Sequence, residues 1–133
     1  MTVGLLIITH QNIGKTLVEA AYSMLNSRPL EAHTLEVGLD CNTDTLIDKA
    51  LSLARQIDQG DGVLILSDVY GSTPSNIAMT LLQQPNMAAV SGINLPMLIR
   101  VFNYPDLPLP QLADKAKSGG RDGILLHASA RNR

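Results

Sequence analysis

The sequence predicts an α/β fold, an open and mostly parallel doubly wound sheet of four strands with helices on both faces. Short apolar runs of strand length alternate with longer segments whose apolar residues recur every three or four positions. The runs are apolar throughout, as expected for parallel strands that are buried on both faces. The chain has 133 residues, of which 45% are hydrophobic. We therefore expect residues 1–133 to form a single domain with one sheet.

The first predicted unit is a buried strand followed by an amphipathic helix. The strand covers Val3 to Thr9, and its apolar run stops at His10. Apolar residues then recur at helical spacing from residue 13 to about Ser27, with Asn12 as the expected N-cap. His10 should thus lie at the carboxyl end of a strand, where open α/β sheets bind their ligands.

The second unit combines a weak strand with a well-defined helix. Residues 33–38 alternate only weakly, which predicts a short strand nearer an edge of the sheet. The Asn-Thr-Asp sequence at 42–44 is a typical helix start, and helical spacing continues from there to Ile57, with Gly60 as the stop.

The third unit contains the most strand-like segment of the chain. It covers Gly62 to Ser67 and, like the first strand, ends at a polar residue, Asp68. In the loop that follows, Thr73 is the expected N-cap and Pro74 the first residue of a helix to about Gln83.

The remaining chain predicts one more unit and a C-terminal appendix. We expect a strand at 87–91, a short helix from Asn94 through Phe102, and a final helix over about 110–117. Gly119-Gly120 should stop that helix, and Gly123 to His127 is a candidate last strand.

This order of elements brings two polar strand ends together if the chain reverses direction after the second strand. The first and third strands are then neighbours, and His10 and Asp68 face each other in one crevice. A neutral imidazole is a good nucleophile, and a carboxylate on one ring nitrogen orients the ring and stabilises positive charge as the other nitrogen reacts. The third helix start, with the hydroxyls of Ser72 and Thr73, suits a phosphoryl group. Each of these residues also has an ordinary interpretation as a turn or cap residue.

Composition narrows the classes of partner. Ten basic and twelve acidic residues give a net charge of -2 without a Lys/Arg cluster, which argues against nucleic acid or an anionic membrane. The single cysteine, Cys41, cannot form an internal disulfide, which fits a reducing compartment. We see no signal-peptide pattern and no apolar run of membrane length. We expect a cytoplasmic protein whose partners are proteins or small molecules.

Three motifs in order carry a resemblance to a known family. They are Ile-Ile-Thr-His at 7–10, Leu-Ser-Asp-Val-Tyr-Gly-Ser-Thr-Pro-Ser-Asn at 66–76, and Val-Ser-Gly-Ile-Asn-Leu-Pro-Met-Leu at 90–98. Together they resemble the mannose-type enzyme IIA domain of the bacterial phosphoenolpyruvate:sugar phosphotransferase system, over nearly the whole chain.

The resemblance implies a phosphocarrier with protein partners and no cofactor or metal of its own. His10 would accept a phosphoryl group from the phosphohistidine of HPr and pass it to an enzyme IIB on a separate chain, in sugar uptake or its regulation. The membrane would be involved only through a transporter complex. The resemblance also implies a homodimer in which the segment 123–127 pairs with the other subunit.

The resemblance assigns roles to the other candidate residues as well. Asp68 would orient and charge-balance the imidazole. Thr73, with Ser72 and Gly71 beside it, would contact the phosphate near the helix start. Tyr70 stands where the family often has Trp and would face the partner.

Other readings of the same residues remain open at this point. Residues 9–16, which end in Gly14-Lys15-Thr16, resemble a nucleotide phosphate-binding loop that lacks its first glycine, although Gly14 to Thr16 is more simply the first turn of a helix. The same loop would hold a flavin phosphate, with only Tyr70 and Tyr104 to flank the ring. A phosphoryl-donor domain of a dihydroxyacetone kinase system resembles the same family.

A metal site receives little support from the sequence. The histidines His10, His33 and His127 lie far apart and lack paired ligand spacing.

Overall fold

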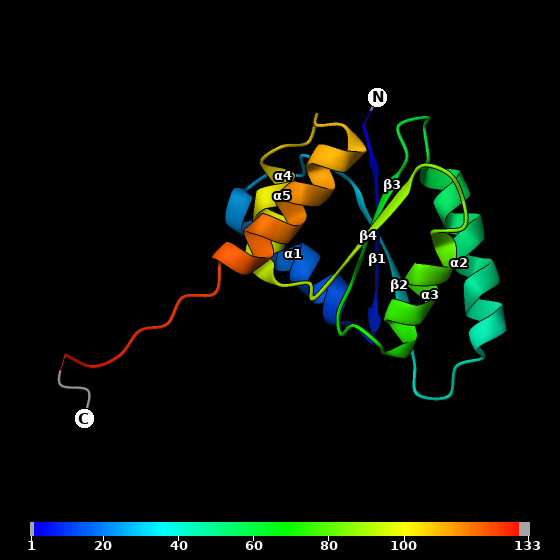
Figure 1. Cartoon of the computed structure of the whole chain (residues 1–133), viewed down its shortest axis with the longest axis horizontal. Helices are drawn as coiled ribbons and strands as arrows, with labels where there is room; N and C mark the ends of the chain where they lie inside the picture. Colours follow the sequence, from blue (N-terminus) through cyan, green and yellow to red (C-terminus); the bar gives the residue numbers. More distant parts are fainter. Residues whose placement is uncertain (1, 131–133) are drawn as a thin grey trace.

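The computed structural model describes residues 2–130 and contains the predicted alternation of strands and helices (Figure 1). Its strands are β1 (Gly4–His10), β2 (Ala32–Val37), β3 (Val63–Ser67) and β4 (Met87–Ser91). Its helices are α1 (Ile13–Leu25), α2 (Thr43–Ile57), α3 (Thr73–Leu81), α4 (Leu95–Phe102) and α5 (Leu109–Asp122). None of the helices within residues 2–130 combines the length and the hydrophobicity needed to span a bilayer.

The strands form an open parallel sheet in the order β2-β1-β3-β4. The predicted α/β fold is confirmed, and so is the reversal after the second strand that makes β1 and β3 neighbours. The two central strands are buried on both sides, which explains why their sequences are apolar without alternation. The weakly patterned β2 lies at an edge, as predicted.

Helices cover both faces of the sheet. In Figure 1, α1, α4 and α5 lie on one side and α2 and α3 on the other. Successive residues of β1 alternate between the two cores, since Leu5 and Ile7 belong to the first cluster and Leu6 and Ile8 to the second. Each such fully buried side chain contributes about 1.5–3 kcal/mol of hydrophobic stabilisation. The central strand is therefore a rigid support for the residue at its carboxyl end.

The prediction that the last helix stops at Gly119-Gly120 is wrong. Helix α5 continues through both glycines to Asp122. A Cβ on Gly119 would lie 2.5 Å from the Cβ of Arg100, and one on Gly120 would lie 2.9 Å from Cε of Met97. The glycines therefore allow α5 to pack closely on α4, and this packing outweighs their low helix propensity.

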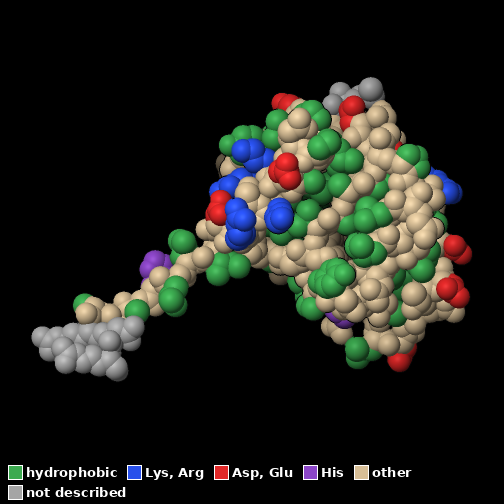
Figure 2. Space-filling model, in the orientation of Figure 1, with side chains coloured by type: hydrophobic (Ala, Val, Ile, Leu, Met, Phe, Trp, Pro, Cys, Tyr) green, Lys and Arg blue, Asp and Glu red, His purple; other side chains and the backbone are tan. Residues whose placement is uncertain are grey.

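The expected strand at 123–127 is absent from the part of the chain that is described. The segment leaves α5 as an extended tail that points away from the body of the molecule (Figure 1), with hydrophobic side chains exposed along it (Figure 2). Leu126 is 95% exposed, and Ile124 and Leu125 are also largely exposed. A strand needs a neighbouring strand for its backbone hydrogen bonds, and within residues 2–130 no strand pairs with residues 123–127.

Candidate functional site

The carboxyl ends of β1 and β3 bring His10 and Asp68 together. Ile8 lies opposite Ser67 in the parallel register, so the residues that follow each strand meet at the same edge of the sheet. Oδ2 of Asp68 accepts the backbone N–H of His10 at 2.9 Å and lies 2.8 Å from Nδ1 of the His10 ring. The juxtaposition expected from the sequence is therefore present.

The hydrogen bond to Asp68 distinguishes the two ring nitrogens of His10. A carboxylate only accepts hydrogen bonds, so Nδ1 carries the proton of the neutral imidazole. No hydrogen bond within residues 2–130 engages Nε2. The His10 side chain is 43% exposed, whereas that of Asp68 is 9% exposed. The arrangement thus presents an unprotonated nitrogen on the surface while the charged partner is shielded.

Several hydrogen bonds keep Asp68 ionised. Burial acts to raise the pKa of this carboxyl, but hydrogen bonds from the His10 backbone, the His10 ring and the Val69 backbone, together with the electrostatic interaction with His10, outweigh it, so the pKa lies below its ordinary value. The Val69 N–H donates to Oδ1 at 2.9 Å. Asp68 is consequently a fixed negative charge that can stabilise a positive imidazole ring.

The turn between β1 and α1 is held by side-chain hydrogen bonds that the sequence pattern did not predict. Oγ1 of Thr9, a buried residue, accepts the N–H of Gly14 at 2.9 Å. Asn12 occupies the N-cap position, as predicted, but its side chain forms no hydrogen bond to the helix. In the orientation that satisfies both groups, its amide nitrogen donates to both carboxylate oxygens of Glu36 at 2.9 Å. A threonine inside an otherwise apolar run was the available signal for this cap.

The turn at residues 9–16 uses several of its N–H groups within the protein rather than for a nucleotide or flavin phosphate. Besides the bond to Gly14, the N–H of Gln11 donates to Val37 at 3.0 Å and that of Thr16 to Asn12 at 2.9 Å. A phosphate-binding loop would direct such N–H groups at the ligand. Here the N–H groups of Gln11, Gly14 and Thr16 are already bonded within the protein, so the geometry disfavours both alternatives.

The start of α3 is different, because no side chain caps it. Ser72 rather than Thr73 is the N-cap residue, since its carbonyl accepts the N–H of Asn76 at 2.8 Å, so the predicted helix start was displaced by one residue. The Ser72 hydroxyl instead donates to the carbonyl of Val69 at 2.5 Å. Thr73 is half-buried, and no bond of its hydroxyl is formed among the described residues. The helix start therefore offers a positive dipole end and a hydroxyl to an anion.

Exposed apolar side chains follow the carboxyl ends of the strands around His10. Tyr70 is 75% exposed, and Ile13, Leu39 and Val69 are also exposed large hydrophobic residues. Gly71, between Tyr70 and the helix start, has a φ of 88°, which explains the glycine there. Ile13, Leu39, Val69 and Tyr70 together are called the apolar rim. Only Tyr70 of this rim could be named from the sequence, because the exposure of the others depends on the tertiary fold.

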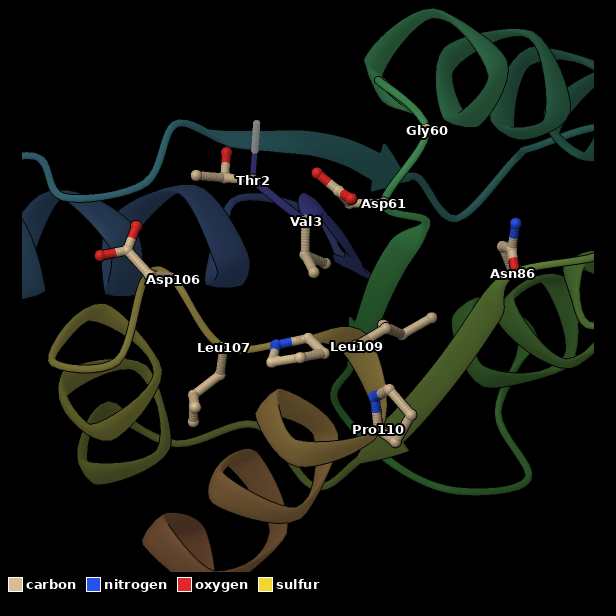
Figure 3. Close-up of a pocket in the computed structure, with 10 residues that line it drawn as sticks. Thr2, Val3, Gly60, Asp61, Asn86, Asp106, Leu107, Leu109 and Pro110 are labelled. Carbon is tan, nitrogen blue, oxygen red and sulfur yellow. The ribbon is translucent and has the colours of Figure 1, made fainter.

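A cavity of about 360 Å³ lies at the opposite end of the strands from His10, near their amino-terminal ends (Figure 3). It is lined by residues that precede the strands, such as Val3, Asp61 and Asn86, and by residues around the start of α5. It is therefore separate from His10. Within the described part of the chain, no group of three or more His, Cys, Asp or Glu residues is arranged to hold a metal ion.

Comparison with known proteins adds independent findings. A family model described as "PTS system fructose IIA component" (EIIA-man), where PTS is the phosphotransferase system, matches residues 4–108. The PTS mannose-specific EIIAB component of Escherichia coli (strain K12) is 27% identical to this chain over 127 residues, which are 93% of this chain and 39% of that protein. The chain thus spans about two fifths of the length of this relative.

Solved structures with the same fold include two phosphotransferase-system proteins. The mannose/sorbose-specific IIA subunit from Enterococcus faecalis superimposes with a TM-score of 0.85 at 20% identity, covering 100% of both chains. Component EIIA from Streptococcus agalactiae superimposes with a TM-score of 0.77 at 20% identity, covering 92% of this chain and 95% of the other. At these identities the structural likeness establishes the fold.

Proposed function

The chain belongs to the EIIA-man family of phosphotransferase-system IIA components, and on that premise we propose that residues 1–133 act as one phosphocarrier domain. His10 accepts a phosphoryl group from phosphorylated HPr and passes it to an enzyme IIB. The observation that carries this proposal is the 2.8 Å contact between Nδ1 of His10 and Oδ2 of Asp68, which leaves Nε2 as the nucleophile.

The charges and protons balance in the proposed transfer. The lone pair of Nε2 forms a bond to phosphorus while the N–P bond of the donor phosphohistidine breaks. The donor ring, protonated on its other nitrogen, leaves as a neutral imidazole. His10 keeps its Nδ1 proton and becomes a phosphorylated imidazolium, whose positive charge faces the carboxylate of Asp68. The same steps in reverse deliver the group to the IIB partner.

The start of α3 is the proposed phosphate contact. Its uncapped first turn and the Thr73 hydroxyl, with Ser72 and Gly71 beside it, favour negative charge at this position. A phosphoryl group in transfer carries its charge on three equatorial oxygens, which such donors stabilise.

The surface around His10 fits a protein partner. The His10 side chain is partly exposed at the carboxyl end of β1, and the exposed residues of the apolar rim, Ile13, Leu39, Val69 and Tyr70, follow the carboxyl ends of β1, β2 and β3. Exposed apolar side chains that gather on one surface are typical of protein-binding sites. HPr and enzyme IIB would dock there in turn, with Tyr70 at the contact.

The tail supports a proposed homodimer. Its apolar residues Ile124, Leu125 and Leu126 are exposed in the single chain, and β4 is an edge strand of the sheet. Pairing of this tail with another subunit would bury both features. We expect sedimentation velocity to show a dimer for the full chain and a monomer for Leu126→Asp.

Labelling from phosphoenolpyruvate tests the phosphocarrier proposal. In the presence of enzyme I and HPr, the wild-type chain should acquire one acid-labile phosphoryl group, and His10→Ala should acquire none. His33→Ala, which changes a histidine on β2, serves as the matched control and should label normally. Undiminished labelling of His10→Ala would refute the site.

The acceptor of the phosphoryl group tests the second half of the proposal. Purified phosphorylated protein should transfer its group to an enzyme IIB. Transfer to a dihydroxyacetone kinase subunit in its place would assign the chain to that system.

A further inference from the structure

The end of β3 is bonded on its far side to the loop that follows β4. The N–H of Gly92 donates to the backbone carbonyl of Asp68 at 2.7 Å, and the N–H of Ile93 donates to the carbonyl of Ser67 at 2.9 Å. The Ser67 and Ser91 hydroxyls also form a hydrogen bond of 3.3 Å. The carboxylate of Asp68 thus contacts His10, while the main-chain carbonyl of Asp68 accepts a hydrogen bond from the β4–α4 loop.

Asn94 ties this loop to two helices. Its Oδ1 accepts the N–H of Met97 at 2.9 Å, which caps α4, and its Nδ2 donates to the carbonyl of Gly120 in α5 at 3.0 Å. Figure 1 shows α4 and α5 together on the same face of the sheet. A single side chain therefore links the loop beside Asp68 to the body of α5.

Two glycines make this linkage possible. Gly92 has a φ of 88°, a conformation that favours glycine, and adopts it where its N–H meets the carbonyl of Asp68. Gly120 lies against this linkage, since a Cβ there would lie 3.5 Å from Oδ1 of Asn94 and 2.9 Å from Cε of Met97. The loop is thus fixed at both ends.

We propose that Asn94 is a positioning residue for phosphoryl transfer, which anchors the β4–α4 loop to α5 and thereby fixes Asp68 in contact with His10. The proposal rests on the proposed function for its kinetic consequence, but its structural consequence at the His10–Asp68 pair is independent of it. Asn94 touches neither His10 nor the phosphoryl group and acts only through the main chain of Asp68.

Three variants separate positioning from simple helix capping. Asn94→Ala removes both hydrogen bonds, whereas Asn94→Asp keeps an acceptor for Met97 and loses the donor to Gly120. Asn42→Ala is the matched control, because Oδ1 of Asn42 caps α2 through the N–H of Thr45 at 3.1 Å. Within residues 2–130, no hydrogen bond links Asn42 to β3.

Transfer rates from phosphorylated HPr give the kinetic readout. Because a small displacement of a catalytic group slows transfer strongly, we expect Asn94→Ala to lower the rate about tenfold and Asn94→Asp to lower it by less. Asn42→Ala should leave the rate unchanged. In an Asp68→Asn background, Asn94→Ala should cost no more than about twofold further, because both changes act on the same contact.

Nuclear magnetic resonance gives a readout that needs no phosphoryl transfer. In Asn94→Ala, the pKa of the Asp68 carboxyl should rise toward its ordinary value and the hydrogen-bonded Nδ1 proton of His10 should exchange faster with water. Asn42→Ala should show neither change. Should Asn94→Ala not fold, the same two signals are measured in Asn94→Asp.

The outcomes are distinct. If the Asn94 variants retain wild-type signals at Asp68 and His10, the positioning role is overturned. It is also overturned if Asn94→Ala slows transfer by the full amount of about tenfold in the Asp68→Asn background. If the wild-type chain accepts no phosphoryl group, the proposed function fails, and the resonance measurements alone decide whether Asn94 fixes Asp68.

Discussion

The starts of α1 and α3 follow neighbouring strands, but they differ in whether a side chain accepts a backbone N–H of the first turn. At α1, the Thr9 hydroxyl accepts the N–H of Gly14, and the N–H of Gln11 donates to the carbonyl of Val37 in β2. At α3, the Ser72 hydroxyl turns back to Val69, and no side chain caps the helix. We call the start of α1, which a side chain caps, the closed helix start, and the start of α3, which no side chain caps, the open helix start. The closed helix start follows His10, and the open one follows Asp68.

This difference indicates that the two helix starts have different roles at the carboxyl ends of the strands. The turn after His10 uses the N–H groups of Gln11, Gly14 and Thr16 for hydrogen bonds within the protein. The open helix start is available to the phosphoryl group, and Asp68 lies between the two. The comparison makes four predictions that differ in size.

The largest effect should come from Asp68→Asn, which removes the negative charge beside His10, between the two helix starts. The amide cannot balance a phosphorylated imidazolium and does not impose the Nδ1-protonated tautomer, so we expect transfer from phosphorylated HPr to slow about 100-fold. Rapid-quench kinetics measure the rate. Circular dichroism should show a folded protein, and a rate within about threefold of wild type would contradict the role of Asp68.

The closed helix start should be sensitive in stability rather than in transfer. Thr9→Val leaves the N–H of Gly14 buried without its acceptor, so the free energy of unfolding should fall by about 2 kcal/mol. Urea denaturation measures this change. Thr80→Val, which removes a more exposed hydroxyl from α3, is the control and should change stability by less than about 0.5 kcal/mol.

The open helix start should be sensitive in transfer. Thr73→Val keeps the shape of the side chain but removes the hydroxyl proposed to meet the phosphoryl group, so the transfer rate should fall about tenfold. Thr16→Val changes an exposed threonine in the first part of α1 and should have no effect. Equal losses in the two variants would show that the two helix starts do not differ in function.

The smallest effect concerns acid stability. The pKa of Asp68 is lower in the folded chain than its ordinary value, so its ionised form stabilises the fold above that ordinary value, about 3.9 in unfolded chains, and this contribution disappears as the pH falls through the folded pKa. The difference in unfolding free energy between wild type and Asp68→Asn should therefore shrink in acid. Urea titrations at neutral pH and near pH 3 test this, and a difference that grows in acid would reverse the assigned sign.

The sheet and the pair of residues at its edge were predictable from local patterns. Buried strands leave apolar runs, helices leave a three-to-four residue period, and parallel order follows from their alternation. The ends of β1 and β3 could therefore be located, and with them the meeting of His10 and Asp68.

Contacts between distant segments were not encoded in such patterns. Thr9 caps α1 in place of Asn12, whose amide turns to Glu36 on another strand. The glycines of α5 serve its packing against Arg100 and Met97 rather than ending the helix. Periodicity along the chain thus determines which residues form strands and helices, whereas caps, close helix contacts and exposure depend on partners that only the folded chain brings near.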